Sequence, residues 1–210
     1  MKKNPVIAVA LTGASGMPYG LRLVESLLRA KARVVLLYSQ AAHLVSKQEL
    51  DLVLPPRAAD AERFFSERFS AKRGQLRVVG REDWFAPVAS GSNPADAMVV
   101  CPCTMGTLAA VAAGLSDNLI ERAADVMLKE GRKLILVPRE TPFSVLHLEN
   151  MLKLARAGAV ILPANPAFYH RPKRVEDLVD FIVARVLDHL GVAHDLMLRW
   201  GERRQRKHQR

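Results

Sequence analysis

The sequence predicts an α/β protein with a single-domain, doubly wound parallel sheet of the Rossmann-like or flavodoxin-like type and helices on both faces. Three observations predict it. Short apolar runs, typical of buried parallel strands, alternate with segments of helical periodicity. The candidate polar groups follow the strands at their carboxyl ends, where open α/β sheets bind ligands. Half of the 210 residues are apolar, which is enough for one sizeable core.

The first strand leads into a turn that suits a phosphate. An apolar run over 6–11 is followed by Gly13-Ala14-Ser15-Gly16 and then by a predicted helix over 17–29. Glycines let backbone N–H groups approach a ligand, and the unpaired N–H groups of a helix start favour an anion. A dinucleotide fingerprint needs glycine where this chain has Ser15 and Pro18. We therefore favour a mononucleotide over NAD, with an ordinary ligand-free turn as the alternative.

Later segments repeat the alternation of strands and helices. Asn118, with Glu121 three residues later, has capping-box spacing, and Thr141 before Pro142 is typical of a helix start. We expect further strands over 33–38, 76–79, 97–102, 133–138 and 158–163, and further helices over 41–50, 61–69, 118–129, 142–157 and 175–190.

Two further turns at strand ends offer hydroxyl groups. Ser39 ends the second strand, where a dinucleotide fold has an acidic residue for the ribose. A hydroxyl there suits a phosphate or ribityl group, and a plain helix N-cap is the compatible alternative. The segment 103–110 is a second strand-to-helix turn rich in small and hydroxyl side chains. Two such turns at one crevice favour a ligand site.

The positive charge of the chain is divided between its end and its body. Residues 199–210 hold six cations and one anion, which is half of the formal net charge of +10. No recognisable nucleic-acid-binding motif accompanies this basic stretch, so we expect no nucleic-acid binding. The charge of the body suits a small phosphorylated ligand. We divide the chain into a domain over 1–192 and a basic tail over 193–210, a possible lid.

The sequence predicts neither a metal site nor a membrane span. Cys101 and Cys103 are one residue apart, too close for a comfortable disulfide, and match no zinc spacing. The six histidines are scattered singly. No apolar run reaches the length of a membrane span, and residues 1–5 lead into the first strand without a cleavage site. We expect a cytoplasmic protein with reduced cysteines.

Four blocks of sequence in this order are similar to one known family. They are Gly13-Ala14-Ser15-Gly16, Cys101-Pro102-Cys103-Thr104-Met105, Gly114-Leu115-Ser116-Asp117-Asn118-Leu119 and Pro138-Arg139-Glu140-Thr141-Pro142-Phe143. With them, residues 5–190 resemble the UbiX flavin prenyltransferase family. The resemblance implies transfer of a dimethylallyl group from dimethylallyl monophosphate to N5 and C6 of reduced FMN, without metal. It also implies a homo-oligomer, in this family usually a dodecamer. The prenylated FMN would serve a UbiD-type decarboxylase, as in ubiquinone biosynthesis.

The resemblance also assigns binding residues. The FMN-binding set is Gly13, Ala14, Ser15, Ser39, Thr104, Met105, Gly106, Thr107, Arg122 and Arg139. Tyr169 and Arg185 match the family's positions for the substrate phosphate, and Arg122, Lys129 and Arg139 supply further charge for it. Fixed cations stabilise the charge that develops on a phosphate leaving group. Many relatives carry lysine where this chain has Arg185, which preserves the charge.

The expected chemistry assigns catalytic roles. Glu140, assisted by Glu49, would handle the proton during ring closure at C6, with a salt bridge to a neighbouring cation as the alternative. The indole face of Trp84 would stabilise an allylic cation. Trp200 is a second candidate on a possible lid, with a solvated tail as the favoured alternative. Ser15 would orient the flavin near N5. The predicted catalytic set is Ser15, Glu49, Trp84, Lys129 and Glu140.

Other functions remain open from the sequence. FMN-dependent cysteine decarboxylases of the phosphopantothenoylcysteine type share the fold and use the motif Pro-x-Met-Asn-x-x-Met-Trp. The corresponding segment 163–169 keeps the proline and the asparagine but has neither methionine nor the tryptophan, which favours prenyl transfer. A non-enzymatic flavin carrier, or a nucleic-acid-associated protein using the basic tail, is the alternative from another class. Steeply salt-dependent DNA binding would support the latter.

Overall fold

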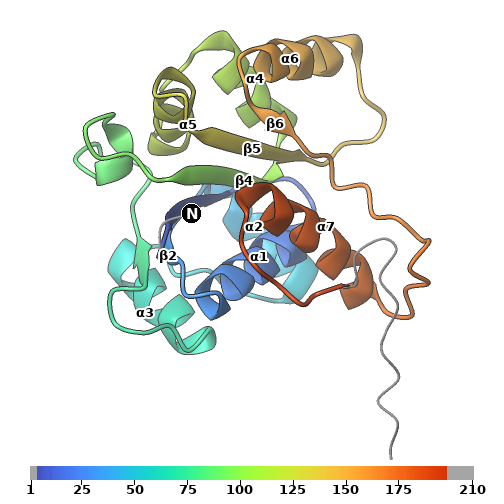
Figure 1. Cartoon of the computed structure of the whole chain (residues 1–210). Coiled ribbons are helices and arrows are strands. Elements are labelled where there is room, and N and C mark those ends of the chain that lie inside the picture. Colours follow the sequence, from blue (N-terminus) through green and yellow to red (C-terminus); the bar gives the residue numbers. More distant parts are fainter. Residues whose placement is uncertain (1–3, 198–210) are drawn as a thin grey trace, which may run out of the picture.

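The computed structural model describes residues 4–197 and shows one six-stranded, fully parallel sheet (Figure 1). The strand order is β3-β2-β1-β4-β5-β6, so the chain reverses direction of winding after β3. This confirms the predicted doubly wound fold. The elements are β1 (Val6–Leu11), α1 (Met17–Arg29), β2 (Arg33–Tyr38), α2 (Gln40–Leu50), α3 (Ala58–Arg68), β3 (Leu76–Val78), the 3-10 turn η1 (Pro87–Ala89), β4 (Ala97–Cys103), α4 (Met105–Ala113), α5 (Leu119–Lys129), β5 (Lys133–Pro138), α6 (Val145–Arg156), β6 (Val160–Ile161) and α7 (Val175–Leu190).

Helices cover both faces of the sheet. Figure 1 shows α4, α5 and α6 on one face and α1, α2, α3 and α7 on the other. Side chains alternate along the central strand β1: Ile7 and Val9 belong to the core under α1 and α7, and Ala8 and Ala10 to the core under α4 and α5. All four are fully buried. Burial on both faces explains why the strand reads as one continuous apolar run.

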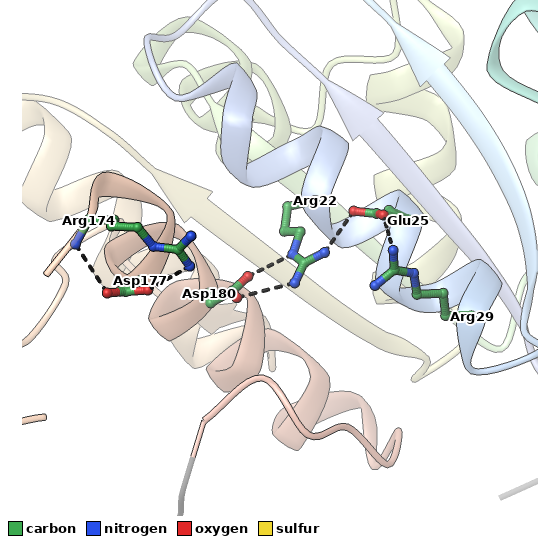
Figure 2. A network of polar contacts seen from close by, with 6 residues as sticks. All are labelled: Arg22, Glu25, Arg29, Arg174, Asp177 and Asp180. Atoms are coloured by element: carbon green, nitrogen blue, oxygen red, sulfur yellow. Dashed lines mark hydrogen bonds and ion pairs between the residues drawn. The ribbon is translucent and has the colours of Figure 1, made fainter. Parts of the chain in front are cut away.

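A guanidinium group links the helices of one face. Arg22 of α1 donates through Nε to Asp180 of α7 over 2.7 Å and through a terminal nitrogen to Glu25 over 2.8 Å (Figure 2). Hydrogen bonding to Asp180 is the largest of the effects that raise the pKa of Arg22 above its usual value. The link fixes α7, which carries Arg185, against the first βα unit.

The start of α6 corrects one expectation. The sequence favoured Thr141 and Pro142 as its first residues, but the helix begins at Val145 with Ser144 as its N-cap. The Ser144 hydroxyl accepts a hydrogen bond from the His147 N–H over 3.3 Å, and His147 Nδ1 accepts one from the Ser144 N–H over 3.2 Å. This reciprocal pair satisfies two backbone donors. The Thr141–Pro142 peptide lies before the helix and is cis.

Two other ends differ from the expectation. The β6 strand contains only Val160 and Ile161 of the predicted run, because it pairs on one side only, with Ile135 and Leu136 of β5. Asn118 caps α5 as predicted, accepting from the N–H groups of residues 120 and 121. The Glu121 carboxylate, however, accepts from the N–H of residue 117, so the capping box is shifted by one residue.

No helix within residues 4–197 is both long and apolar enough to cross a membrane. Trp200 and residues 198–210 of the basic tail lie outside the described residues.

Candidate functional site

A buried threonine joins the carboxyl ends of the two central strands. Thr12 follows β1 and is 1% exposed. Its hydroxyl donates to the Pro102 carbonyl over 2.8 Å and accepts from the Thr104 N–H over 2.9 Å. The two turns predicted to converge are therefore tied together through one side chain. The sequence reasoning missed Thr12, although a lone hydroxyl ending an apolar strand was a signal.

The turn after β1 is packed tightly against α2. A Cβ on Gly13 would overlap with the Cβ of Ala41, so only glycine permits this approach. Ala14 is buried, whereas Ser15 is exposed at the carboxyl edge of the sheet. Gly16 has φ = 120°, a value that L side chains rarely adopt. The sequence prediction of a glycine-dependent turn that presents Ser15 is confirmed in its geometry.

A carboxylate of the chain itself occupies the start of α1. Glu49 accepts hydrogen bonds from the Gly16 N–H over 3.0 Å and from the Met17 N–H over 2.8 Å. The sequence predicts a ligand phosphate at this helix start, and here the carboxylate of Glu49 satisfies two of the N–H donors in place of a ligand. Glu49 itself thereby comes to the turn that carries Ser15. Phosphate binding at this turn stays a prediction. Burial chiefly raises the pKa of Tyr19, in the same turn of helix, and Cys101 and Glu49 act in the same direction.

Arg139 brings the end of β5 to the end of β1. Its Nε donates to the Ser15 carbonyl over 3.2 Å, and its N–H donates to the Cys103 carbonyl over 3.4 Å. The next residue, Glu140, is half-buried, and its carboxylate accepts from the Thr141 N–H over 3.1 Å. Ser15, Arg139 and Glu140, which the sequence placed in one site, thus lie at one edge of the sheet.

Hydroxyl groups line the same edge and also cap helices. Thr104 is the N-cap of α4: its hydroxyl accepts from the Thr107 N–H over 3.0 Å and donates to the Thr107 hydroxyl over 2.9 Å. Met105 is buried beneath this turn, while Gly106 is exposed on it. Ser39 caps α2 and accepts from the Ala42 N–H over 3.3 Å. The capping role proposed for Ser39 is confirmed, and each hydroxyl retains a further lone pair for a ligand.

Tyr169 packs against α7 from the segment before it, and Arg185 is a residue of that helix. The ring of Tyr169 packs edge-on against Phe181, with centroids 5.9 Å apart, and Arg185 follows Phe181 by one helical turn. Tyr169 is 53% exposed. The Arg185 guanidinium donates to Asp188 over 2.7 Å. A ligand phosphate at this position would share the cation with Asp188.

Lys129 lies away from the groups described so far. It is in the last turn of α5, pairs with Glu130, and contacts Gly91 in the segment before β4. This is the amino end of the sheet, opposite the edge that carries Ser15. The α5 helix therefore separates Lys129 from Arg122 by two turns, roughly 10 Å along the axis. Both side chains nonetheless reach the segment 89–91, Arg122 at the Ala89 carbonyl and Lys129 at Gly91, so their binding to one phosphate stays a prediction.

Arg122 lies against the same segment between β3 and β4 that Lys129 contacts, and Trp84 belongs to this segment. Arg122 donates to the Ala89 carbonyl over 3.0 Å and to Asp125 over 2.7 Å. Trp84 is 44% exposed, and its neighbour Phe85 is fully exposed. The indole of Trp84 is accessible enough to contact a ligand or another copy of the chain.

This chain is similar to known flavoproteins over most of its length. The Flavoprotein family matches residues 1–187. The flavin prenyltransferase UbiX of Pseudomonas aeruginosa is 58% identical over 196 residues, which is 93% of this chain and 94% of that protein. The chain belongs to the UbiX flavin prenyltransferase family. The resemblance of the four sequence blocks is thereby confirmed, as is the prediction of a flavoprotein enzyme.

Solved structures of UbiX-type proteins agree. AnUbiX (PadA1), in complex with FMN and dimethylallyl pyrophosphate, is 42% identical, covers 95% of this chain and 98% of its own, and superimposes with a TM-score of 0.84. A dodecameric FMN-dependent UbiX-like decarboxylase from Escherichia coli O157:H7 is 41% identical, with coverages of 90% and 96% and a TM-score of 0.79. A PPC decarboxylase, at 15% identity and a TM-score of 0.56, shares only the fold. The cysteine-decarboxylase alternative is not favoured.

The donor set at the carboxyl edge fits the flavin mononucleotide of a UbiX-type enzyme. It offers the hydroxyls of Ser15, Ser39 and Thr107 and the guanidinium of Arg139, the groups that phosphate and ribityl oxygens bind. Exposed Gly106 leaves open space where a side chain would stand, since the nearest heavy atom to an added Cβ is 3.9 Å away. Within residues 4–197, no cluster of three or more His, Cys, Asp or Glu side chains could hold a metal ion.

Proposed function

We propose that this chain transfers the dimethylallyl group of dimethylallyl monophosphate to N5 and C6 of reduced FMN. The observation that carries the proposal is the hydrogen bond from Arg139 to the Ser15 carbonyl, which assembles a phosphate-binding cation, a hydroxyl and the Glu140 carboxylate at one sheet edge. Family membership supports the same reaction. The charges for the leaving phosphate come from side chains and not from a metal ion, because the sequence has no aspartate-rich magnesium motif.

Reduced FMN supplies the nucleophilic N5 and C6 atoms. The chain binds its phosphate and ribityl groups through Arg139, Ser39 and residues 104–107. Ser15, exposed on its turn, orients the ring near N5. During ring closure the prenyl double bond gains a proton and C6 loses one as the new carbon–carbon bond forms. Glu140 handles this proton transfer, and Glu49, hydrogen-bonded to the Ser15 turn, assists it. Trp84 presents its indole face to the allylic carbon.

The substrate phosphate is bound by cations from more than one copy of the chain. Tyr169 packs on Phe181 of α7 and Arg185 follows Phe181 by one helical turn, whereas Arg122 and Lys129 lie on α5 against the segment 89–91. The UbiX-like decarboxylase from Escherichia coli O157:H7 is dodecameric, which supports an assembly of many copies here. We infer a homo-oligomer, with twelve copies, in which Arg122 and Lys129 serve the site of a neighbouring copy.

We infer that a second enzyme uses the product. Prenylated FMN passes to a UbiD-type decarboxylase, as in ubiquinone biosynthesis, and the enzyme acts in the cytoplasm. Two free, buried cysteines are compatible with a reducing compartment.

The direct test is anaerobic incubation of the protein with reduced FMN and dimethylallyl monophosphate, without added metal, followed by mass spectrometry of the released flavin. We expect a flavin heavier by one five-carbon prenyl unit. Glu140→Gln should lower the rate by about 100-fold or more, because general acid–base catalysis typically contributes that much. Glu149→Gln, an exposed change on α6, is the control and should leave the rate unchanged. Unmodified flavin with both the monophosphate and the diphosphate would refute the proposal.

A further inference from the structure

A second concave site lies at the opposite edge of the sheet. A cavity of about 640 Å³ opens between the turn that joins α1 to β2 and the segment that joins α3 to β3. Its lining includes Arg33, the first residue of β2, and Gln75, which directly precedes β3. These residues mark the amino ends of the strands. The cavity is therefore separate from the flavin site at the carboxyl ends.

The lining is strongly basic. Six cations and one carboxylate contribute to it. Residues 1–198 carry half of the +10 net charge of the chain. The net charge of the residues that line this cavity is as large as the net charge of residues 1–198. This lining is therefore a strongly positive region of the body, separate from Arg139 at the flavin site. The six cations are Arg29, Lys31, Arg33, Arg68, Lys72 and Arg73.

The single carboxylate leaves most of this charge unneutralised. Glu25 lies between Arg22 and Arg29 and accepts from both, over 2.8 Å and 2.6 Å (Figure 2). Among the described residues 4–197, no carboxylate forms an ion pair with Arg33, Arg68, Lys72 or Arg73. Like charges this close repel each other, so an anion that binds between them would relieve the repulsion.

The walls of the cavity are fixed by hydrogen bonds. The Gln75 side chain donates to the Leu28 carbonyl over 2.6 Å and to the Ala32 carbonyl over 3.2 Å, and it accepts from the Lys72 N–H over 3.1 Å. It therefore links the two turns that carry the cations. Phe69 forms an apolar part of the lining and is itself supported by Phe65, with parallel rings 6.0 Å apart.

We propose that this cavity binds a small ligand that carries two or more linked phosphate groups. Its volume is in the range of small-molecule sites. Arginine binds phosphate in a bidentate manner, and four arginines around one cavity can hold more than one phosphate group. A single phosphate would neutralise only a part of the local charge. A nucleoside diphosphate and inorganic pyrophosphate share this chemistry, and Phe69 offers an apolar surface for the organic part of the former.

The test is calorimetric titration of the oxidised, FMN-loaded protein, saturated with dimethylallyl monophosphate so that the substrate phosphate site is filled. The probes are inorganic pyrophosphate, ADP and AMP. We expect pyrophosphate and ADP to bind at least tenfold more tightly than AMP. Tighter binding of ADP than of pyrophosphate would identify the nucleotide as the preferred source of the diphosphate, and the reverse order would identify the inorganic ion.

The double variant Arg68→Ala with Arg73→Ala should weaken diphosphate binding at least tenfold. The matched control is Arg57→Ala with Arg63→Ala, which removes the same charge from the neighbourhood of the same helix but outside the cavity. The control should bind as the parent protein does. Replacement of Arg68 and Arg73 by lysine should restore part of the affinity.

Three outcomes would overturn the proposal. Equal affinity in the cavity variant and the control would mean that the diphosphate binds elsewhere. AMP binding as tightly as ADP would exclude a diphosphate site. Binding of short duplex DNA that is lost in the cavity variant, without binding of pyrophosphate or ADP, would assign the cavity to nucleic acid instead.

Discussion

Close packing at Gly13 makes this residue sensitive to the smallest substitution. In Gly13→Ala the new Cβ would overlap with Ala41, so either the turn or α2 must shift. We expect a loss of about 1–3 kcal/mol in the free energy of unfolding, as in other overpacked sites. Urea denaturation would measure it. Gly106→Ala is the control, since its Cβ meets nothing nearer than the Thr104 hydroxyl at 3.9 Å and should change stability by less than about 0.5 kcal/mol. Equal effects would contradict the packing argument.

Tyr38, at the end of β2, makes stability depend on alkaline pH. Its hydroxyl donates to the Pro55 carbonyl over 2.6 Å, and burial raises its pKa to about 12 from the ordinary value of 10.0. The folded state thus favours the neutral phenol. This contribution is complete below pH 10 and is lost as the pH rises from 10 towards 12.

We therefore expect the free energy of unfolding to fall between pH 10 and 12, and to fall less in Tyr38→Phe. Urea unfolding across this pH range would measure both. The variant also loses one hydrogen bond, so its stability at neutral pH should be lower by roughly 1 kcal/mol. An identical pH dependence in the two proteins would show that the Tyr38 phenol is not the responsible group.

At the scale of single elements, the start of α6 gives a clean comparison. Ser144→Ala removes the hydroxyl that accepts from the His147 N–H and should cost about 1 kcal/mol of stability. Thr141→Ala should have almost no effect, because Thr141 precedes the helix by several residues. Urea unfolding of the two variants decides between the structure and the sequence-based expectation. A larger loss for Thr141→Ala would restore Thr141 as the cap.

The elements predicted correctly are those with strong local signals. The α1 helix has Pro18 near its start, and α7 ends at Gly191 in the left-handed conformation. The start of α6 failed because Thr141 and Ser144 are both good caps, and the choice depends on contacts that a local pattern does not contain. The length of β6 depends on pairing with β5, which is also non-local.

The same distinction applies to the site. Sequence reasoning placed Ser15 and Arg139 together because both follow strands of one parallel sheet, whose carboxyl ends share an edge. It did not place Glu49 against the start of α1, since that contact spans more than thirty residues. It grouped Lys129 with Arg122 by helical periodicity, and both lie on α5 and contact the segment 89–91, but periodicity did not indicate that segment as their neighbour.

At the scale of the whole molecule, α6 is incompletely covered. Leu148 and Leu152, one turn apart on one face of α6, are 52% and 50% exposed in the single chain. Apolar stripes of this kind mark interfaces. Leu148→Asp with Leu152→Asp should dissociate the proposed homo-oligomer, as measured by light scattering, because charges would be buried without partners. Lys153→Asp, on an exposed position of the same helix, is the control and should leave the assembly intact.

The division of the site between copies leads to a complementation experiment. Ser15 and Lys129 lie at opposite edges of one chain, so a complete site would take Ser15 from one copy and Lys129 from another. Ser15→Ala and Lys129→Ala should each lose prenyl transfer as pure proteins. When they are co-expressed with different tags and purified as mixed oligomers, random assembly restores both residues at about one quarter of the sites. Recovery of activity only in the mixture would place Lys129 in a neighbouring site, whereas no recovery would require both residues to act from the same chain.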